Sequence, residues 1–199
     1  MRSATAASRP IVSELWPAIG AGATLRAVVL ALIGSLLLAA SAKVQVPFWP
    51  VPMTMQTFVV LALGAAYGWR LGLATVLLYL AEGAAGMPVF AGTPEKGIGL
   101  AYMMGPTGGY LVGFAVAAAL VGFLAERRAM RGWLALTFVM LLGHAAIFAF
   151  GLSWLAAAIG WSKAIAGGLT PFWAATALKT ALAVVFIGGL ERIVSPRRR

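Results

Sequence analysis

The sequence predicts an all-α integral membrane protein with six transmembrane helices. Hydrophobic residues make up 62% of the 199 residues, and charged residues only 10%, whereas soluble domains carry about 25% charged residues. The mean hydropathy is +0.95. Every arginine lies between hydrophobic segments or at a terminus, which is the charge pattern of a chain that crosses a membrane repeatedly.

Six apolar stretches follow one another along the chain, each close to the ~20 residues that a helix needs to cross the hydrocarbon core. They cover about residues 24–42, 53–69, 70–86, 107–125, 133–152 and 171–190. The second and third are short and adjoin at Gly68–Arg70, so we expect a tight turn between them. Together with a polar N-terminal segment (1–17) and a basic tail (191–199), they form a single membrane domain over residues 1–199.

The arginines also predict the orientation of the spans. They lie before the first span or in its first turn, and after the second, fourth and sixth, whereas the intervening gaps hold only lysines. Because short, positively charged loops stay in the cytoplasm, both termini are expected on the inner side. The net charge of +10 then indicates anionic lipid as the partner, and no nucleic acid. The arginines are Arg2, Arg9, Arg26, Arg70, Arg127, Arg128, Arg131, Arg192 and Arg197–Arg199.

The two longer connections, residues 43–52 and 87–105, are expected on the outer side. The first carries three prolines together with Phe48 and Trp49, and the second is rich in glycine and proline. Proline fixes φ and lacks an amide donor, so these segments should be extended or turned, with limited flexibility. Loops of this kind can form a lid over a binding site.

The first span carries small residues at every fourth position. Ala23, Ala27, Ala31, Ser35 and Ala39 therefore stack along one helical face. Small residues at this spacing let helix backbones approach closely in lipid. The face serves either packing within this protein or the docking of another membrane subunit, and for docking the candidate residues are Ala27, Ala31 and Ser35.

Two charged side chains lie well inside predicted spans, where a charge is costly and faces a cavity or a partner. Lys179 lies in the sixth span on the same face as Thr176 and Phe172, and Glu82 lies toward the outer end of the third span on the same face as Tyr79. One interpretation is a structural ion pair between Lys179 and Glu82. The other is a ligand site, in which the lysine donates to a ligand oxygen.

The sequence offers little for catalysis. It contains no cysteine and a single histidine, His144, so neither a metal cluster nor a Ser-His-Asp triad can be assembled. We therefore expect that the protein is not an enzyme and that it binds neither a metal ion nor a cofactor. The phosphate-loop motif G-x-x-x-x-G-K-[ST] is missing as well, so any ATP hydrolysis that drives transport must come from another subunit.

Four segments carry a resemblance to a known family. They are Lys43–Pro47, Val51–Gln56, Gly86–Gly92 and Gly105–Tyr110. In this order they resemble the BioY family, the substrate-binding S components of energy-coupling factor biotin transporters. The resemblance implies a six-helix S-component fold in the bacterial cytoplasmic membrane. It further implies high-affinity capture of biotin from the outer side, and partners in a transmembrane T component and two cytoplasmic ATPase subunits.

The resemblance also implies site residues. The family's sixth-span pattern, Pro-Phe followed by Asp and three residues later by Lys, falls on Pro171, Phe172, Thr176 and Lys179. The lysine matches, but Thr176 stands where the family has an aspartate, and it lacks the carboxylate's charge. Glu82 is a candidate to replace that charge.

Biotin needs polar partners for its ureido ring and carboxylate, and an apolar or aromatic wall for its carbons. We hypothesise that Lys179 is the main polar anchor and that the first outer loop closes over the ligand. The loop after Gly92 reads differently from many relatives, and Thr93 is its candidate contact. The other candidates are Gln56, Tyr79, Tyr110, Thr176, Glu82, Phe48, Trp49 and Phe90.

Two rival functions use the same residues differently. A proton-coupled carrier of small solutes would use Glu82 as its proton site, and its transport would collapse with the pH gradient. An intramembrane transferase would yield turnover products. Neither has a supporting motif in the sequence.

Overall fold

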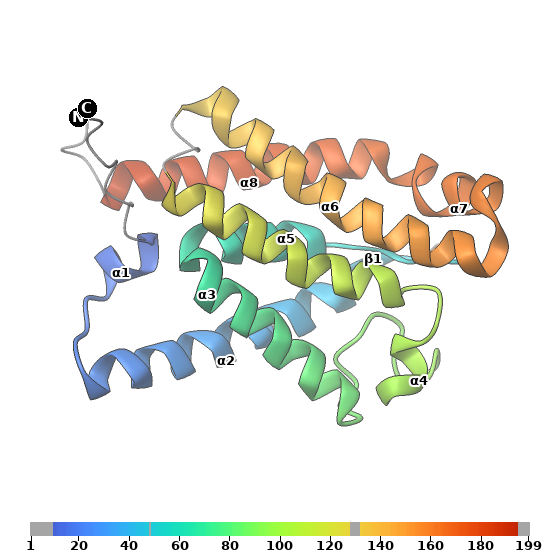
Figure 1. The fold of residues 1–199 in the computed structure, drawn as a ribbon, viewed down its shortest axis with the longest axis horizontal. Coiled ribbons are helices and arrows are strands. Elements are labelled where there is room, and N and C mark those ends of the chain that lie inside the picture. The colour runs from blue at the N-terminus through green and yellow to red at the C-terminus, as the bar shows by residue number, and fades with distance from the viewer. Residues whose placement is uncertain (1–9, 48, 128–131, 195–199) are drawn as a thin grey trace, which may run out of the picture.

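Long helices that pack side by side make up most of the computed structural model, which describes residues 10–47, 49–127 and 132–194 (Figure 1). The helices are α1 (Ile11–Leu15), α2 (Ala21–Lys43), α3 (Gln56–Ala84), α4 (Gly99–Met103), α5 (Gly108–Glu126), α6 (Trp133–Ile159), α7 (Trp161–Gly168) and α8 (Trp173–Val194). A 3-10 turn, Thr170–Phe172, precedes α8. A short antiparallel hairpin pairs β1 (Gln45–Val46) with β2 (Met53–Thr54).

Within the described residues, five segments are long and apolar enough to cross a membrane: α2, α3, α5, α6 and Trp161–Val194, which includes α7 and α8. The spans predicted over 24–42, 107–125, 133–152 and 171–190 correspond to α2, α5, α6 and α8. Helix α6 continues to Ile159 and ends at Gly160, whose φ of 82° suits the end of a helix. Within the predicted loop 43–52, Gln45–Val46 is extended and forms strand β1 of the hairpin.

The spans predicted over 53–69 and 70–86 form one element, α3, which reverses direction at Gly68. Gly68 has φ 79° and ψ 172°, a conformation that L side chains rarely adopt. The reversal is evident from Gln56 and Tyr79, whose side chains lie 2.7 Å apart although 23 residues separate them. In a straight helix that separation would be about 34 Å. The expected tight turn is therefore present, and Figure 1 shows the two arms of α3 meeting at the left of the view.

A carboxylate from another helix fixes this turn. The Trp69 amide donates to Glu126 Oε1 at 3.1 Å, which places a negative charge at the start of the second arm, where unpaired amides favour it. A side chain at Gly68 would overlap Glu126, so the position requires glycine for space as well as for φ. The end of α5 and the bend of α3 are thus held together.

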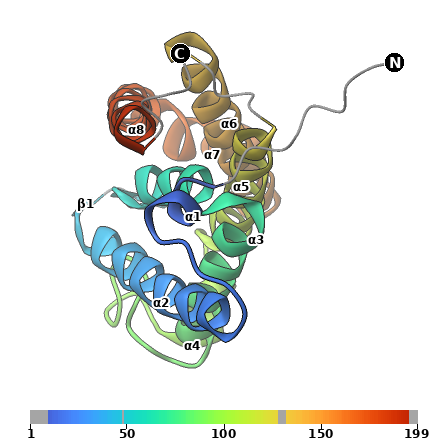
Figure 2. The ribbon, with the colours of Figure 1, turned by 90° about the vertical axis from the view of Figure 1, so that its left-hand side faces the viewer.

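The helices pack in the order α2, α3, α5, α6 and α8, as the view along the bundle shows (Figure 2). Glycines allow the closest approaches. A Cβ at Gly64 would lie 2.7 Å from the Ala118 carbonyl, and one at Gly113 would lie 2.8 Å from Ile147 Cα. Gly109 meets Trp154 in the same way. The glycines at the start of α5 therefore serve contact with α6.

The described basic residues are separated by type between the two ends of the bundle. Helix α2 begins, α3 bends, and α5 and α8 end at the left of Figure 1, where Arg26, Arg70, Arg127 and Arg192 are found. Three of these guanidiniums stack on aromatic rings, with the carbon atom 4.5–4.8 Å from the ring centroid. Toward the opposite end lie Lys163 on α7, Lys43 at the end of α2 and Lys96 in the loop before α4. The other arginines of the predicted pattern fall outside the described residues.

Candidate functional site

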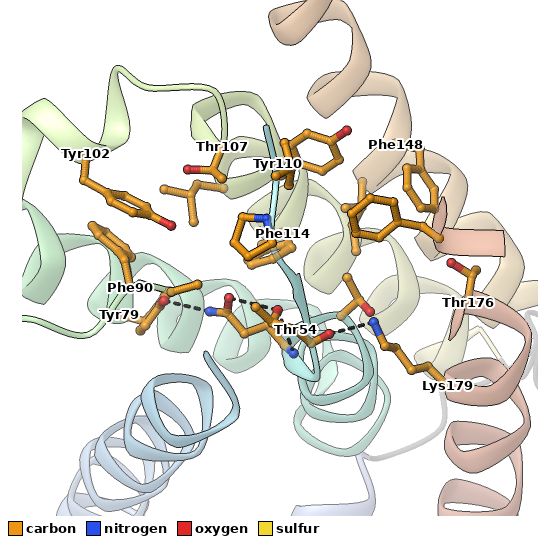
Figure 3. A pocket seen from close by; sticks show the side chains of 18 residues that line it. Thr54, Tyr79, Phe90, Tyr102, Thr107, Tyr110, Phe114, Phe148, Thr176 and Lys179 are labelled. Atoms are coloured by element: carbon orange, nitrogen blue, oxygen red, sulfur yellow. Dashed lines mark hydrogen bonds between the residues drawn. The ribbon is translucent and has the colours of Figure 1, made fainter. Parts of the chain in front are cut away.

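A pocket lies at the end of the bundle that carries the β hairpin, and six of the predicted ligand contacts line it. They are Lys179, Thr176, Tyr110, Gln56, Tyr79 and Phe90. The remaining lining residues, which were not among the predicted contacts, are Val51, Pro52, Thr54, Thr57, Ala91, Tyr102, Thr107, Leu111, Phe114, Ile147, Phe148 and Phe172. We call this the central pocket. Figure 3 shows these side chains converging from α3, α5, α6, α8 and the two outer connections.

A chain of hydrogen bonds runs along one side of the central pocket. Lys179 Nζ donates to the Thr54 carbonyl at 2.6 Å, and Thr54 Oγ1 donates to Gln56 Oε1 at 3.2 Å. Gln56 Nε2 donates to Tyr79 Oη, which donates in turn to the Val89 carbonyl at 3.2 Å. The chain joins α8, the end of β2, both arms of α3 and the loop before α4 (Figure 3). It fixes these polar groups before any ligand arrives.

Lys179 is the most unusual member of this chain, because its ammonium group is drawn into a buried site. The residue is only 6% exposed, and the partner of its ammonium within the described residues is a neutral carbonyl. A buried cation with a single neutral partner has bonding capacity left over for a ligand oxygen. In the described part of the chain Lys179 and Glu82 do not pair, so the structural ion pair is not formed.

Aromatic rings form the other walls. Phe90 stacks on Tyr102 with ring centroids 4.9 Å apart and meets Tyr79 edge-on at 5.5 Å. Phe148 contacts Tyr110 and Phe172 edge-on. Burial raises the pKa of the Tyr102 hydroxyl, and a side-chain hydrogen bond with Thr107 opposes that rise. Tyr102 therefore stays a neutral hydrogen-bonding group at ordinary pH.

Glu82 lies outside the central pocket. Its carboxylate accepts a hydrogen bond from the Ser35 hydroxyl, which joins α3 to α2. Ser35 is only 1% exposed, so this part of the predicted small-residue face packs within the protein. Ala31 and Ala27, one and two turns earlier on α2, are half-buried.

Phe90 of the second outer connection lines the central pocket as expected, but two other predicted contacts from the outer loops, Trp49 and Thr93, do not. Trp49 is 82% exposed, because Val51 and Pro52 occupy the lining positions of its loop instead. Thr93 is buried but outside the pocket, since its hydroxyl donates to the Phe90 carbonyl and accepts from Lys43 Nζ. Phe48 lies outside the described residues.

Several lining residues were not predicted, although the spacing or position of some of them in the sequence indicates the pocket. Phe114 follows Tyr110 by four residues, which places both rings on one face of α5. Thr54 stands two residues before Gln56 in a segment already selected. Ile147 and Phe148 carried no signal, because every face of α6 is apolar. Only packing against α5 and α8 determines which of its residues face the pocket.

Comparisons with known proteins agree with this architecture. A sequence profile described as the BioY family matches residues 12–196. The chain is 36% identical over 150 residues to "Probable biotin transporter BioY" of Pyrococcus horikoshii, covering 75% of this chain and 86% of that protein. It is 37% identical over 149 residues to "Biotin transporter BioY" of Thermotoga maritima, covering 74% and 85%.

The fold has a solved relative. The crystal structure of the "S-component for biotin from an ECF-type ABC transporter" aligns with a TM-score of 0.76, covering 88% of this chain and 95% of that one. The sequence identity is 23%, so this match establishes the fold alone.

Proposed function

The chain belongs to the BioY family, and on that premise we propose that it is the biotin-binding transmembrane subunit of a vitamin importer. The observation that carries the proposal is the central pocket, where one buried ammonium and an aromatic enclosure lie together. Lys179 donates to the ureido or carboxylate oxygens, while Gln56, Tyr79 and Thr176 offer neutral polar groups. The rings of Phe90 and Tyr110 cover the apolar carbons.

Six membrane crossings follow if each arm of α3 is counted separately. We assign the arginine end of the bundle to the cytoplasm, which places both termini inside and the central pocket toward the outer face. Biotin is then captured from outside, in the cytoplasmic membrane of a bacterial cell. The sequence has no phosphate loop, so the ATP that drives import is hydrolysed by partner subunits.

The binding assignment is tested with Lys179→Ala. Removing the ammonium leaves the ligand oxygen without its donor, so we expect biotin affinity to fall at least about tenfold, the effect of one charge-assisted hydrogen bond. Equilibrium binding of labelled biotin to the purified protein in detergent measures it. Lys163→Ala, an exposed lysine on α7, is the matched control and should bind as the unaltered protein does.

Two results would contradict the assignment. Full biotin affinity in Lys179→Ala would remove the lysine from recognition. No binding by the unaltered protein would remove biotin as the ligand.

The partner assignment concerns the exposed side of α2. Among the helices and strands of the described residues, only α3 and β2 contact α2 closely. The side of α2 that faces away from the bundle presents Val28 and Leu32, which are about half exposed. We assign this side, with Ala27 and Ala31, to docking on a transmembrane T component. Small residues here let a second helix approach.

Replacing Ala31 with leucine should block that approach. We expect the complex with T and ATPase subunits to co-purify at a reduced level, while biotin binding by the isolated subunit stays within about twofold. The same substitution at Ala145, an exposed alanine on α6, is the control and should leave assembly intact. Equal loss of assembly and binding would instead indicate that Ala31 packs within this protein.

A further inference from the structure

The Thr57 hydroxyl is buried in the described structure without a hydrogen-bond partner, and Thr57 lines the central pocket. Such a group normally finds a partner, because an unpaired buried hydroxyl loses its bonds to water and gains nothing in return. A valine would have nearly the same shape without this penalty. The hydroxyl therefore indicates a partner that the protein itself does not supply.

Other threonines in these helices show what Thr57 lacks. Thr75 and Thr137 both donate to the carbonyl four residues earlier, at 2.7 Å and 2.8 Å. Thr57 is the second residue of α3, so the residue four before it, Met53, belongs to strand β2. The carbonyl three residues before it, that of Thr54, already accepts the Lys179 ammonium at 2.6 Å. The local backbone thus leaves the Thr57 hydroxyl without the usual acceptor.

The surrounding polar groups define what the missing partner offers. Lys179 Nζ carries three N–H bonds, and the described structure assigns one of them to Thr54. Thr176 also lines the central pocket with a neutral hydroxyl. The Lys179 ammonium can donate to a carbonyl oxygen, and the hydroxyls of Thr57 and Thr176 can accept from N–H groups. A ligand group that fits these three side chains therefore has a carbonyl oxygen with an N–H next to it. A cyclic urea has this pattern.

We propose that Thr57 is a further ligand-binding residue, whose hydroxyl accepts a hydrogen bond from a ureido N–H while Lys179 donates to the ureido oxygen. This inference rests on the proposed biotin function and adds a residue to its site. It also supplies a neutral acceptor in addition to Thr176, which lines the same pocket. Thr57 and Thr176 can then each accept one of the two N–H groups of the ring.

The test compares Thr57→Val, which keeps the shape, with Thr57→Ser, which keeps the hydroxyl. Biotin affinity should fall about three- to tenfold in Thr57→Val, the range for one neutral hydrogen bond, and stay within about twofold in Thr57→Ser. Without ligand, the thermal unfolding midpoint of Thr57→Val should be equal to or higher than that of the unaltered protein, because no protein hydrogen bond is lost. Thr75→Val is the matched control, with a lower midpoint and unchanged affinity.

A second ligand locates the contact. Desthiobiotin keeps the ureido ring but lacks the sulfur, so Thr57→Val should weaken its binding by the same factor as that of biotin. Unchanged biotin affinity in Thr57→Val would overturn the proposal and leave water as the partner of the hydroxyl. A loss for biotin alone would overturn the ureido assignment. Failure of the unaltered protein to bind biotin would overturn the proposed function and this inference with it.

Discussion

Lys43 ties the two outer connections together above the central pocket. As the last residue of α2, it donates from Nζ to the Phe90 carbonyl at 3.0 Å, to the Thr93 carbonyl at 3.3 Å and to Thr93 Oγ1 at 3.1 Å. The Phe90 ring fills the pocket wall beside Tyr79 and Tyr102. One ammonium therefore positions the segment that encloses a ligand.

Lys43→Met keeps most of the aliphatic stem and removes the donors. We expect the segment around Phe90 to loosen, so that bound biotin dissociates several-fold faster, as one or two hydrogen bonds of about 1 kcal/mol each would predict. Stopped-flow displacement of labelled biotin measures the rate. Lys163→Met serves as the control, and an unchanged dissociation rate in Lys43→Met would show that Phe90 holds its place without the lysine.

Some residues of the candidate site could be predicted from the sequence around them, whereas their contacts with distant segments could not. Lys179 was predictable because a cation inside an apolar span needs a cavity or a partner. Its actual partner, the Thr54 carbonyl, lies 125 residues away in sequence, and no pattern along the chain encodes such a contact. Trp49 was predicted as a ligand contact but is exposed, since an aromatic residue in such a loop can point outward as easily as inward.

At the scale of elements, glycine determines how closely α5 approaches α6. A Cβ at Gly113 would meet the backbone of Ile147, which cannot move aside as a flexible side chain would. Gly109 and Gly113 are one turn apart on the same face of α5. The separation of these two helices, and with it the width of the pocket between Phe114 and Phe148, depends on these missing side chains.

Gly113→Ala should therefore destabilise the protein by about 1–3 kcal/mol through overpacking. Thermal unfolding in detergent, followed by loss of native fluorescence, measures the change. A Cβ added at Gly189, on α8, would meet no other atom of the described structure within 4 Å, so Gly189→Ala should be neutral or stabilising by up to about 1 kcal/mol. Equal midpoints for the two variants would show that α5 and α6 can separate at little cost.

The long elements could be predicted because length and hydropathy alone define a span. Their ends could not, because α6 does not stop at the predicted residue 152 but continues to Ile159. Helices α1, α4 and α7 were not predicted either. All three are too short to span a membrane, and α7 also contains a serine, a lysine and two glycines.

At the scale of the whole molecule, the described arginines lie at one end of the bundle and most of the described lysines toward the other. Arg70 follows the bend of α3 at one end, and Lys163 lies on α7 at the other. Both side chains are exposed. Since arginine-rich loops stay in the cytoplasm, the two residues are predicted to face opposite sides of the membrane.

The absence of cysteine from the sequence makes this orientation directly testable. In intact cells, a membrane-impermeant maleimide should label Lys163→Cys, whereas Arg70→Cys should react only after the membrane is permeabilised. The unaltered protein gives the background. Labelling of Arg70→Cys in intact cells would reverse the assigned orientation, and labelling of both would place the two ends on one side.

The bend at Gly68 has a consequence for biogenesis. The arms of α3, residues 56–67 and 69–84, are about 18 Å and 24 Å long as helices, whereas the hydrocarbon core is about 30 Å thick. Neither arm matches that thickness as a separate helix. We therefore expect the translocon to retain the first arm until the second has left the ribosome, and to release the two arms into the lipid together.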